Sequence, residues 1–209
     1  MKEKIKETRA WFTKILTEGA KNLVEKAISD NSGRRSFTDK ELELIKRGME
    51  KRIIMVEGNK FVLSNNPERR YDAFTLNREY FTQFAVFVEL IEEYGYKIKD
   101  CQFEYHMMDI CVFRNKKPFI YIETKVSDYE TKKLINEIKE KYSKNLQELQ
   151  NLPDRGNDPL RKAKYIFSDK PKFLKVITPQ NSFSYSVEYT KDGFNLYQID
   201  NIPKANNSL

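Results

Sequence analysis

One short run constrains the fold more than any other part of the sequence: residues 117–126, KPFIYIETKV, which carry Glu123 and Lys125 near their C-terminal end. Its β-branched and aromatic residues are typical of a buried strand. Side chains two positions apart share one face of a strand, so Tyr121, Glu123 and Lys125 point the same way. A core strand with a carboxylate and an ammonium on one face needs partners for both charges.

The β-rich run before it, KIKDCQFEYHMMDICVFR, supplies one such partner. It ends at Arg114, and residues 115–117 are the expected hairpin loop. Arg114 then lies opposite Pro118, and the same register places Asp109 opposite Glu123. Cβ atoms of cross-strand pairs lie about 4.5–5.5 Å apart. The sequence therefore predicts two carboxylates and a lysine on one patch of a sheet.

Two facing carboxylates destabilise a hairpin, and Lys125 relieves their repulsion only in part. A divalent cation accounts for the arrangement, because Mg²⁺ takes one or two carboxylates and keeps water or phosphate oxygens as its other ligands. Lys125 can then hold or deprotonate an attacking water, or stabilise charge on a scissile phosphate. The alternative without a metal is an exposed sheet face whose charges are solvated.

The spacing of these residues resembles the PD-(D/E)XK nuclease superfamily. Asp109 is followed by thirteen residues and then by Glu123-Thr124-Lys125, with an apolar helix before them and an amphipathic helix after. Met108 stands where the family has a proline. The resemblance covers about residues 75–178 and implies the element order α, β, β, β, α, β. The implied fold is α+β, a restriction-endonuclease-like mixed sheet flanked by helices.

The resemblance also implies roles for these residues. Asp109 and Glu123 would bind Mg²⁺, with Mn²⁺ as a substitute, and Lys125 would assist the water. A glutamate of the preceding helix often joins such sites, and Glu79 is preferred here to Glu89. The expected substrate is nucleic acid, DNA rather than RNA, cut by an endonuclease of restriction, repair or defence type. A homodimer would suit the two strands of a duplex, although the sequence carries no interface signal.

Other chemistries have little support in the sequence. Glu137 and Lys139 have the same spacing as Glu123 and Lys125, but a predicted helix separates their side chains. The single histidine, His106, is expected on the strand face opposite Asp109, which disfavours a serine or cysteine hydrolase site. There is no glycine-rich phosphate loop and no His/Cys metal cluster.

The N-terminal third is basic and is expected to contact phosphate. Residues 1–70 hold 17 Lys and Arg against 11 Asp and Glu, whereas residues 71–209 are nearly neutral. The order helix, helix and hairpin in residues 1–66 resembles a winged-helix domain, and the alternative is a helical cap on the second domain. The candidate phosphate contacts are Arg34, Arg35, Lys46, Arg47, Lys51, Arg52, Arg69 and Arg70.

Two domains are expected, 1–70 for nucleic-acid binding and 71–209 for catalysis, joined by the polar, proline-containing linker 65–72. The other expected elements are one or two helices over residues 3–30, a capped helix from Thr38, a hairpin turning at 57–60, a core helix 78–94, a long capped helix from Ser127, a helix 158–167, a strand at 172–178 and a last hairpin turning at 192–193.

The function expected overall is Mg²⁺-dependent hydrolysis of phosphodiester bonds. The competing class is a DNA-binding regulator, or a partner subunit whose nuclease-like core is structural. No run approaches the length of a membrane span, and the charged N-terminus lacks the apolar stretch of a signal peptide, so a cytoplasmic location is expected. Cys101 and Cys111 are expected to be reduced and to pack as small hydrophobic residues.

Overall fold

The computed structural model describes residues 6–8, 10, 11, 14, 21, 37–58, 60–71, 79–153 and 155–206. The chain divides after Ile98 into two compact units. Most of the helix expected over residues 3–30 lies outside the described residues, as do Arg34 and Arg35. Within the described part of the chain, no helix is long and apolar enough to cross a membrane.

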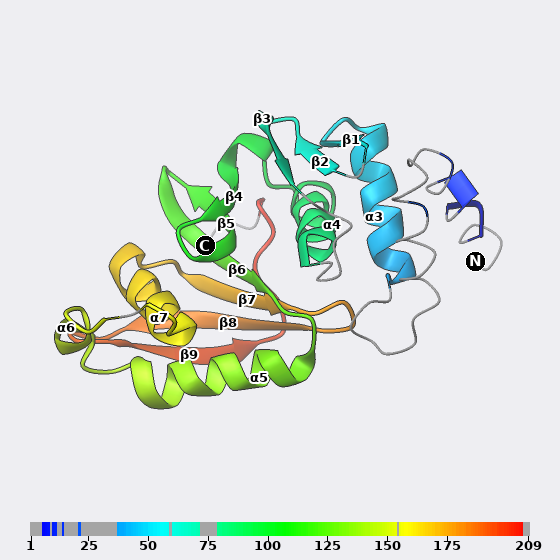
Figure 1. Cartoon of the computed structure of the whole chain (residues 1–209). Coiled ribbons are helices and arrows are strands. Elements are labelled where there is room, and N and C mark those ends of the chain that lie inside the picture. The colour runs from blue at the N-terminus through cyan, green and yellow to red at the C-terminus, as the bar shows by residue number, and fades with distance from the viewer. Residues whose placement is uncertain are drawn as a thin grey trace. The chain divides into compact units, whose positions relative to one another are not determined.

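From residue 37 onward, the first unit combines the helices α3 and α4 with a small antiparallel sheet of order β1-β2-β3 (Figure 1). The helix α3 begins as expected, with Thr38 and Glu41 forming a capping box. The expected hairpin turns at Gly58, whose φ of 65° suits glycine. The elements are α3 (Asp39–Glu50), β1 (Ile54–Glu57), β2 (Lys60–Leu63), β3 (Asn66–Tyr71) and α4 (Glu79–Glu92).

The strand β3 replaces most of the linker that was expected over residues 65–72. It pairs with β2, with Phe61 opposite Tyr71 and an irregularity between Val62 and Leu63. Only Tyr71 is buried, because β3 is an edge strand, and such strands tolerate proline and polar residues. A solvated edge strand therefore has the composition of a linker.

The helix α4, which was expected to open the second domain, belongs to the first unit. Ten of its residues are buried, from Phe81 to Leu90. It packs closely on α3, since a Cβ on Gly48 would lie 2.5 Å from Val88 Cγ2. The compact units thus divide after Ile98, whereas the sequence placed a boundary between residues 70 and 71.

The second unit contains a mixed six-stranded sheet of order β4-β5-β6-β7-β8-β9, in which only β6 and β7 are parallel. The short 3₁₀ turn η1 (Ile98–Asp100) leads into it. The chain crosses from β6 to β7 through a helical segment, as a parallel connection requires. The strands are β4 (Cys101–Tyr105), β5 (Met108–Arg114), β6 (Lys117–Thr124), β7 (Phe173–Ile177), β8 (Ser182–Tyr189) and β9 (Phe194–Ile199).

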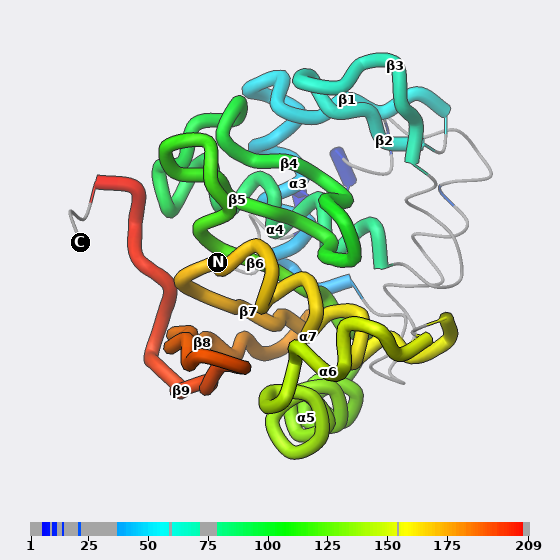
Figure 2. Tube along the Cα trace, turned by 90° about the vertical axis from the view of Figure 1, so that its left-hand side faces the viewer, coloured from blue at the N-terminus to red at the C-terminus, as the bar shows by residue number. Residues whose placement is uncertain are grey.

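The helical segment covers one face of this sheet (Figures 1 and 2). Ser127 caps it as expected, accepting a hydrogen bond from the Glu130 N–H. The single long helix expected here is instead broken by a π-helical turn and a loop. The segment consists of α5 (Asp128–Glu137), the π-helix η2 (Ile138–Tyr142), α6 (Leu146–Leu149) and α7 (Asp158–Asp169), the last of which is the separate helix expected over residues 158–167. The expected stripe still faces the sheet, with Leu134, Ile138 and Leu146 buried.

The register predicted for the central hairpin is confirmed over three pairs, among them Ile110 opposite Ile122. The predicted three-residue loop is wrong. Asn115 and Lys116 form a two-residue turn, both with positive φ, and a bulge after Val112 lets Arg114 pair with Lys117 instead of Pro118. The β-rich run before it is itself a hairpin, β4 and β5, which turns at His106 and Met107.

Both cysteines are free and buried, as expected. Burial raises the pKa of the Cys101 thiol to about 12 and raises the pKa of Cys111 as well. Both side chains are therefore neutral thiols near pH 7 and act as small core residues.

The last hairpin, β8 and β9, lies directly against the helical segment at Gly193. A Cβ there would lie 2.1 Å from the Ser143 carbonyl oxygen, which already accepts the Phe194 N–H at 2.9 Å.

Gly193→Ala is expected to lower the free energy of unfolding by about 1–3 kcal/mol in urea denaturation, because the backbone must move to admit the methyl group. Gly156→Asn is the control. Gly156 has open space around it and a φ of 79°, which asparagine tolerates, so a comparable loss there would contradict this account.

Candidate active site

Asp109 and Glu123 lie at one end of the β5–β6 hairpin, next to the paired residues Ile110 and Ile122. Asp109 Oδ2 accepts hydrogen bonds from the backbone N–H and the hydroxyl of Thr124, at 2.6 and 2.7 Å. Asp109 is thereby tied to the residue that follows Glu123. The hairpin brings together the two acids that the sequence pattern predicted.

Glu123 is a buried carboxylate held by two ammonium groups. Its side chain is 3% exposed. Lys125 Nζ donates to Oε1, and Lys162 Nζ lies 2.8 Å from Oε2. Each carboxylate oxygen thus has its own cation, which is what a buried charge requires.

Lys162 was missed by the sequence analysis. It lies on α7, which Asn157 caps by accepting the Leu160 N–H. The Lys162 side chain is 5% exposed and also donates to the Met107 carbonyl oxygen. Its position could have been noticed, because Lys162 precedes the buried Ile166 by four residues and so shares its helix face. A lysine on the buried face of a helix requires a negative charge nearby, and Glu123 supplies it.

Lys125 differs from Lys162 in its access to solvent. It follows the last residue of β6, and its backbone N–H donates to the Ile177 carbonyl oxygen at 2.8 Å. Its side chain is 19% exposed, against 5% for Lys162. Of the two ammoniums on Glu123, that of Lys125 is the more accessible to solvent.

The donor set of Asp109 and Glu123 fits a hard divalent cation. It consists of carboxylate oxygens, which Mg²⁺ prefers, and two carboxylates leave positions for water. In the described part of the chain, no three His, Cys, Asp or Glu residues group together as a richer metal site. A cation at Glu123 would compete with the ammonium groups for the carboxylate.

The two candidate helix acids lie on α4, in the first unit. Glu79 is the first residue of α4 and is half-buried. Glu89 forms an ion pair with Lys40 of α3, and its side chain is 12% exposed. Because the two units are described separately, the joining of either acid to the site stays a prediction.

Several of the candidate phosphate contacts have acidic partners within the first unit. Arg47 lies 2.6 Å from Glu93, and Lys51 pairs with Glu92. Three further cations make weaker or exposed contacts: Lys46 with Glu50 at 3.9 Å, Arg70 with Glu57 at 2.9 Å, and Arg69 over the Tyr71 ring at 4.9 Å. Four of the six described candidates therefore already face a carboxylate.

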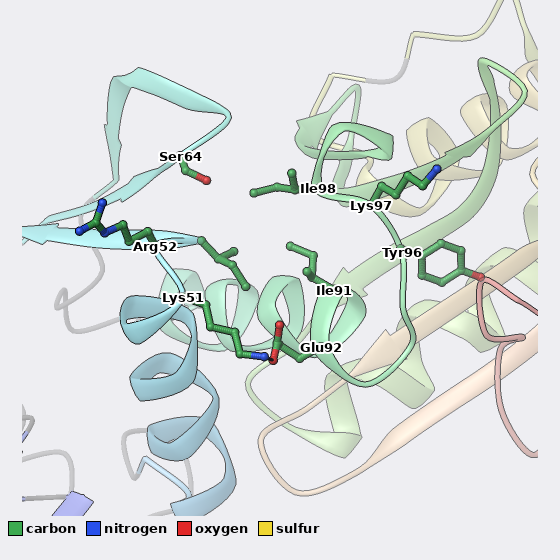
Figure 3. A pocket seen from close by; sticks show the side chains of 9 residues that line it. Lys51, Arg52, Ser64, Ile91, Glu92, Tyr96, Lys97 and Ile98 are labelled. Atoms are coloured by element: carbon green, nitrogen blue, oxygen red, sulfur yellow. Dashed lines mark hydrogen bonds and ion pairs between the residues drawn. The ribbon is translucent and has the colours of Figure 1, made fainter.

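Arg52 and Lys97 are exceptions: both are exposed, and neither has an ion-pair partner among the described residues. They lie at two sides of an open hollow of about 410 Å³ (Figure 3). Its lining is partly apolar, with Ile53, Ile91 and Ile98. Arg52 was among the predicted phosphate contacts, whereas Lys97 was not.

His106 forms a separate cluster at the β4–β5 turn. Its Nδ1 lies 2.9 Å from Asp169 Oδ2, and the Tyr121 hydroxyl donates to the same oxygen. Burial and the neighbouring Asp169 raise the pKa of Tyr121, which keeps its hydroxyl neutral. The His106 side chain is 37% exposed and stacks on Tyr105. The sequence placed His106 on a strand face opposite Asp109, whereas it lies in the β4–β5 turn with a φ of 52°.

Comparison of the chain with protein-family models, with curated proteins and with solved structures found no match.

Removing the charge of Glu123 is expected to destabilise the metal-free protein. Glu123→Gln leaves Lys162 buried without its carboxylate, and breaking a buried ion pair on one side costs about 3–5 kcal/mol. We therefore expect a loss of about 3 kcal/mol in the free energy of unfolding, measured in urea with EDTA. Glu137→Gln, which changes the other acid of the same spacing, is expected to lie within about 0.5 kcal/mol of wild type. Equal stability of the two variants would contradict the buried triad.

Proposed function

We propose that this protein is a Mg²⁺-dependent nuclease that hydrolyses phosphodiester bonds of DNA, as an endonuclease, with a restriction-endonuclease-like core in its second unit. The observation that carries the proposal is the gathering of Asp109, Glu123 and Lys125 at one end of the β5–β6 hairpin. Two carboxylates and a lysine are the groups that this chemistry needs.

The three residues would have different roles. Asp109 and Glu123 would hold Mg²⁺, which supplies positive charge for the phosphate oxygens and lowers the pKa of bound water. Lys125, the more exposed of the two lysines at Glu123, is suited to orient the attacking water or to stabilise the charge that develops on the phosphate. Mn²⁺ has the same oxygen preference and is expected to substitute.

The order of elements supports the proposal. The chain runs through α4, the three antiparallel strands β4, β5 and β6, the helical crossover, and β7 parallel to β6. This is the order α, β, β, β, α, β that the resemblance implies. The helix α7 of the crossover delivers Lys162 to Glu123, so the crossover also serves the site.

The alternative function is a DNA-binding regulator or a partner subunit with a structural core. One observation favours it: Glu123 has an ammonium at each oxygen, so the cluster satisfies itself without a metal. Against it stands Asp109, which a structural Lys-Glu-Lys cluster does not need. Metal-dependent cleavage decides between the two functions.

Incubation with supercoiled plasmid, linear duplex, single-stranded DNA and RNA, each with Mg²⁺ or with EDTA, tests the proposal. We expect plasmid nicking or linearisation with Mg²⁺ and none with EDTA. Asp109→Ala and Lys125→Ala are expected to lower the rate at least 100-fold, since they remove a metal ligand and a charge-stabilising group. Glu137→Ala should cleave at the wild-type rate. Metal-independent cleavage, or full activity of Lys125→Ala, would contradict the proposed mechanism.

The first unit is expected to bind the DNA backbone through cations that lack acidic partners. Arg52→Gln should weaken binding of a labelled duplex in EDTA and lower the slope of log affinity against log salt concentration by about 1. Arg47→Gln is the matched control, because its guanidinium is already paired with Glu93. If the two variants change the slope equally, pairing does not determine which cations contact DNA. Point variants are preferable to removal of residues 1–66, since that cut would separate β3 from β2.

A further inference from the structure

Lys162 has the contacts of a group that holds its neighbours rather than one that touches a substrate. Its ammonium donates to Glu123 Oε2 and to the Met107 carbonyl oxygen, and it lies 3.5 Å from Asp158 Oδ1. An ammonium has three N–H donors. Three oxygens therefore surround Lys162 at close range, and with a side chain that is 5% exposed it is closed to a phosphate from solvent.

These contacts connect three parts of the second unit. Lys162 comes from α7, Met107 belongs to the turn before β5, and Glu123 lies near the end of β6. Asp109 is only two residues beyond Met107. A rigid cation at this point orients the Glu123 carboxylate and fixes the turn that leads to Asp109.

The charges of the site balance without any metal. Asp109 and Glu123 contribute two negative charges, and Lys125 and Lys162 contribute two positive charges. Asp158 is about half-exposed and adds little after solvent screening. A divalent cation at Glu123 therefore meets a carboxylate whose two oxygens already contact ammonium groups. A phosphodiester in the site would add the missing negative charge.

We propose that Lys162 is a positioning residue that holds Glu123 and keeps the metal affinity of the free protein low, so that Mg²⁺ binds tightly only together with substrate phosphate. This inference rests on the proposed function, because it concerns the metal that the nuclease would use. Lys125, at the more exposed oxygen of Glu123, keeps its role toward the water and the phosphate.

Lys162→Met tests the proposal in the absence of substrate. It keeps most of the side-chain volume and removes one positive charge beside Glu123, so the affinity for a divalent cation should rise about tenfold. The probe is Mn²⁺, and its free concentration is followed by electron paramagnetic resonance in a titration of each full-length protein. Lys162→Arg retains the charge and should bind Mn²⁺ as wild type does.

Lys164→Met is the matched control on the same helix. Lys164 is also buried, but its ammonium donates to the carbonyl oxygens of Gln150 and Leu152, at 3.2 and 2.7 Å, so its loss should lower stability without changing Mn²⁺ affinity. Tighter binding by Lys162→Met alone supports the proposal. Unchanged or weaker binding overturns it, as does equal tightening by the Arg variant or by Lys164→Met.

Two further outcomes separate this inference from the proposed function. If neither wild type nor Lys162→Met binds Mn²⁺, the inference is overturned, and the plasmid assay alone decides whether the protein is a nuclease. If wild type binds no Mn²⁺ but Lys162→Met does, the inference is supported. In the plasmid assay, Lys162→Met should then reach half-maximal cleavage at a lower Mg²⁺ concentration, with a lower maximal rate because Glu123 is less well oriented.

Discussion

Burial of Glu123 is the constraint on which the second unit depends. A carboxylate taken out of water costs several kcal/mol unless cations and hydrogen bonds compensate it. Two lysines from different elements do so here, one from the end of β6 and one from α7. The helical crossover must therefore return across the sheet at the height of Glu123, and the apolar cluster that includes Tyr121, Ile166 and Leu174 fills the space between. The helix α7 therefore has two roles, because it covers the apolar core and also supplies Lys162, the second cation at Glu123.

The first unit arranges its charges by the same principle, but at its surface. Two of the candidate cations, Lys46 and Arg47, lie on α3. Glutamates at the end of α4 and just after it pair with cations of this unit, as in the pairs Arg47 with Glu93 and Lys51 with Glu92. Such exposed pairs contribute about 0–1 kcal/mol each, so they do little for stability. Their consequence is for binding: a cation that already faces a carboxylate gains less from a phosphate. The net charge of the N-terminal third therefore overestimates the number of its cations that are available to contact a phosphate.

Local patterns predicted much of the fold. The caps at Thr38 and Ser127, the hairpin register at Ile110 and Ile122, and the placement of Asp109 and Glu123 at one hairpin end all follow from contacts between near neighbours in sequence. What the sequence did not predict depends on contacts between distant residues. The packing of α4 on α3 assigns it to the first unit, and Lys162 reaches Glu123 only because the crossover returns over the sheet. Edge strand β3 was missed for another reason, since its solvated residues carry no apolar alternation.

The central claim is that Asp109 and Glu123 form one cation site beside two lysines. A crystal of the wild-type protein with a bound oligonucleotide, soaked in Mn²⁺ and with diffraction data recorded at the manganese absorption edge, tests it most directly. This account predicts an anomalous peak within about 2.0–2.4 Å of carboxylate oxygens of both Asp109 and Glu123, with Lys162 still at Glu123. An anomalous peak bound to other carboxylates, or none at these two residues even with a bound oligonucleotide, would contradict it.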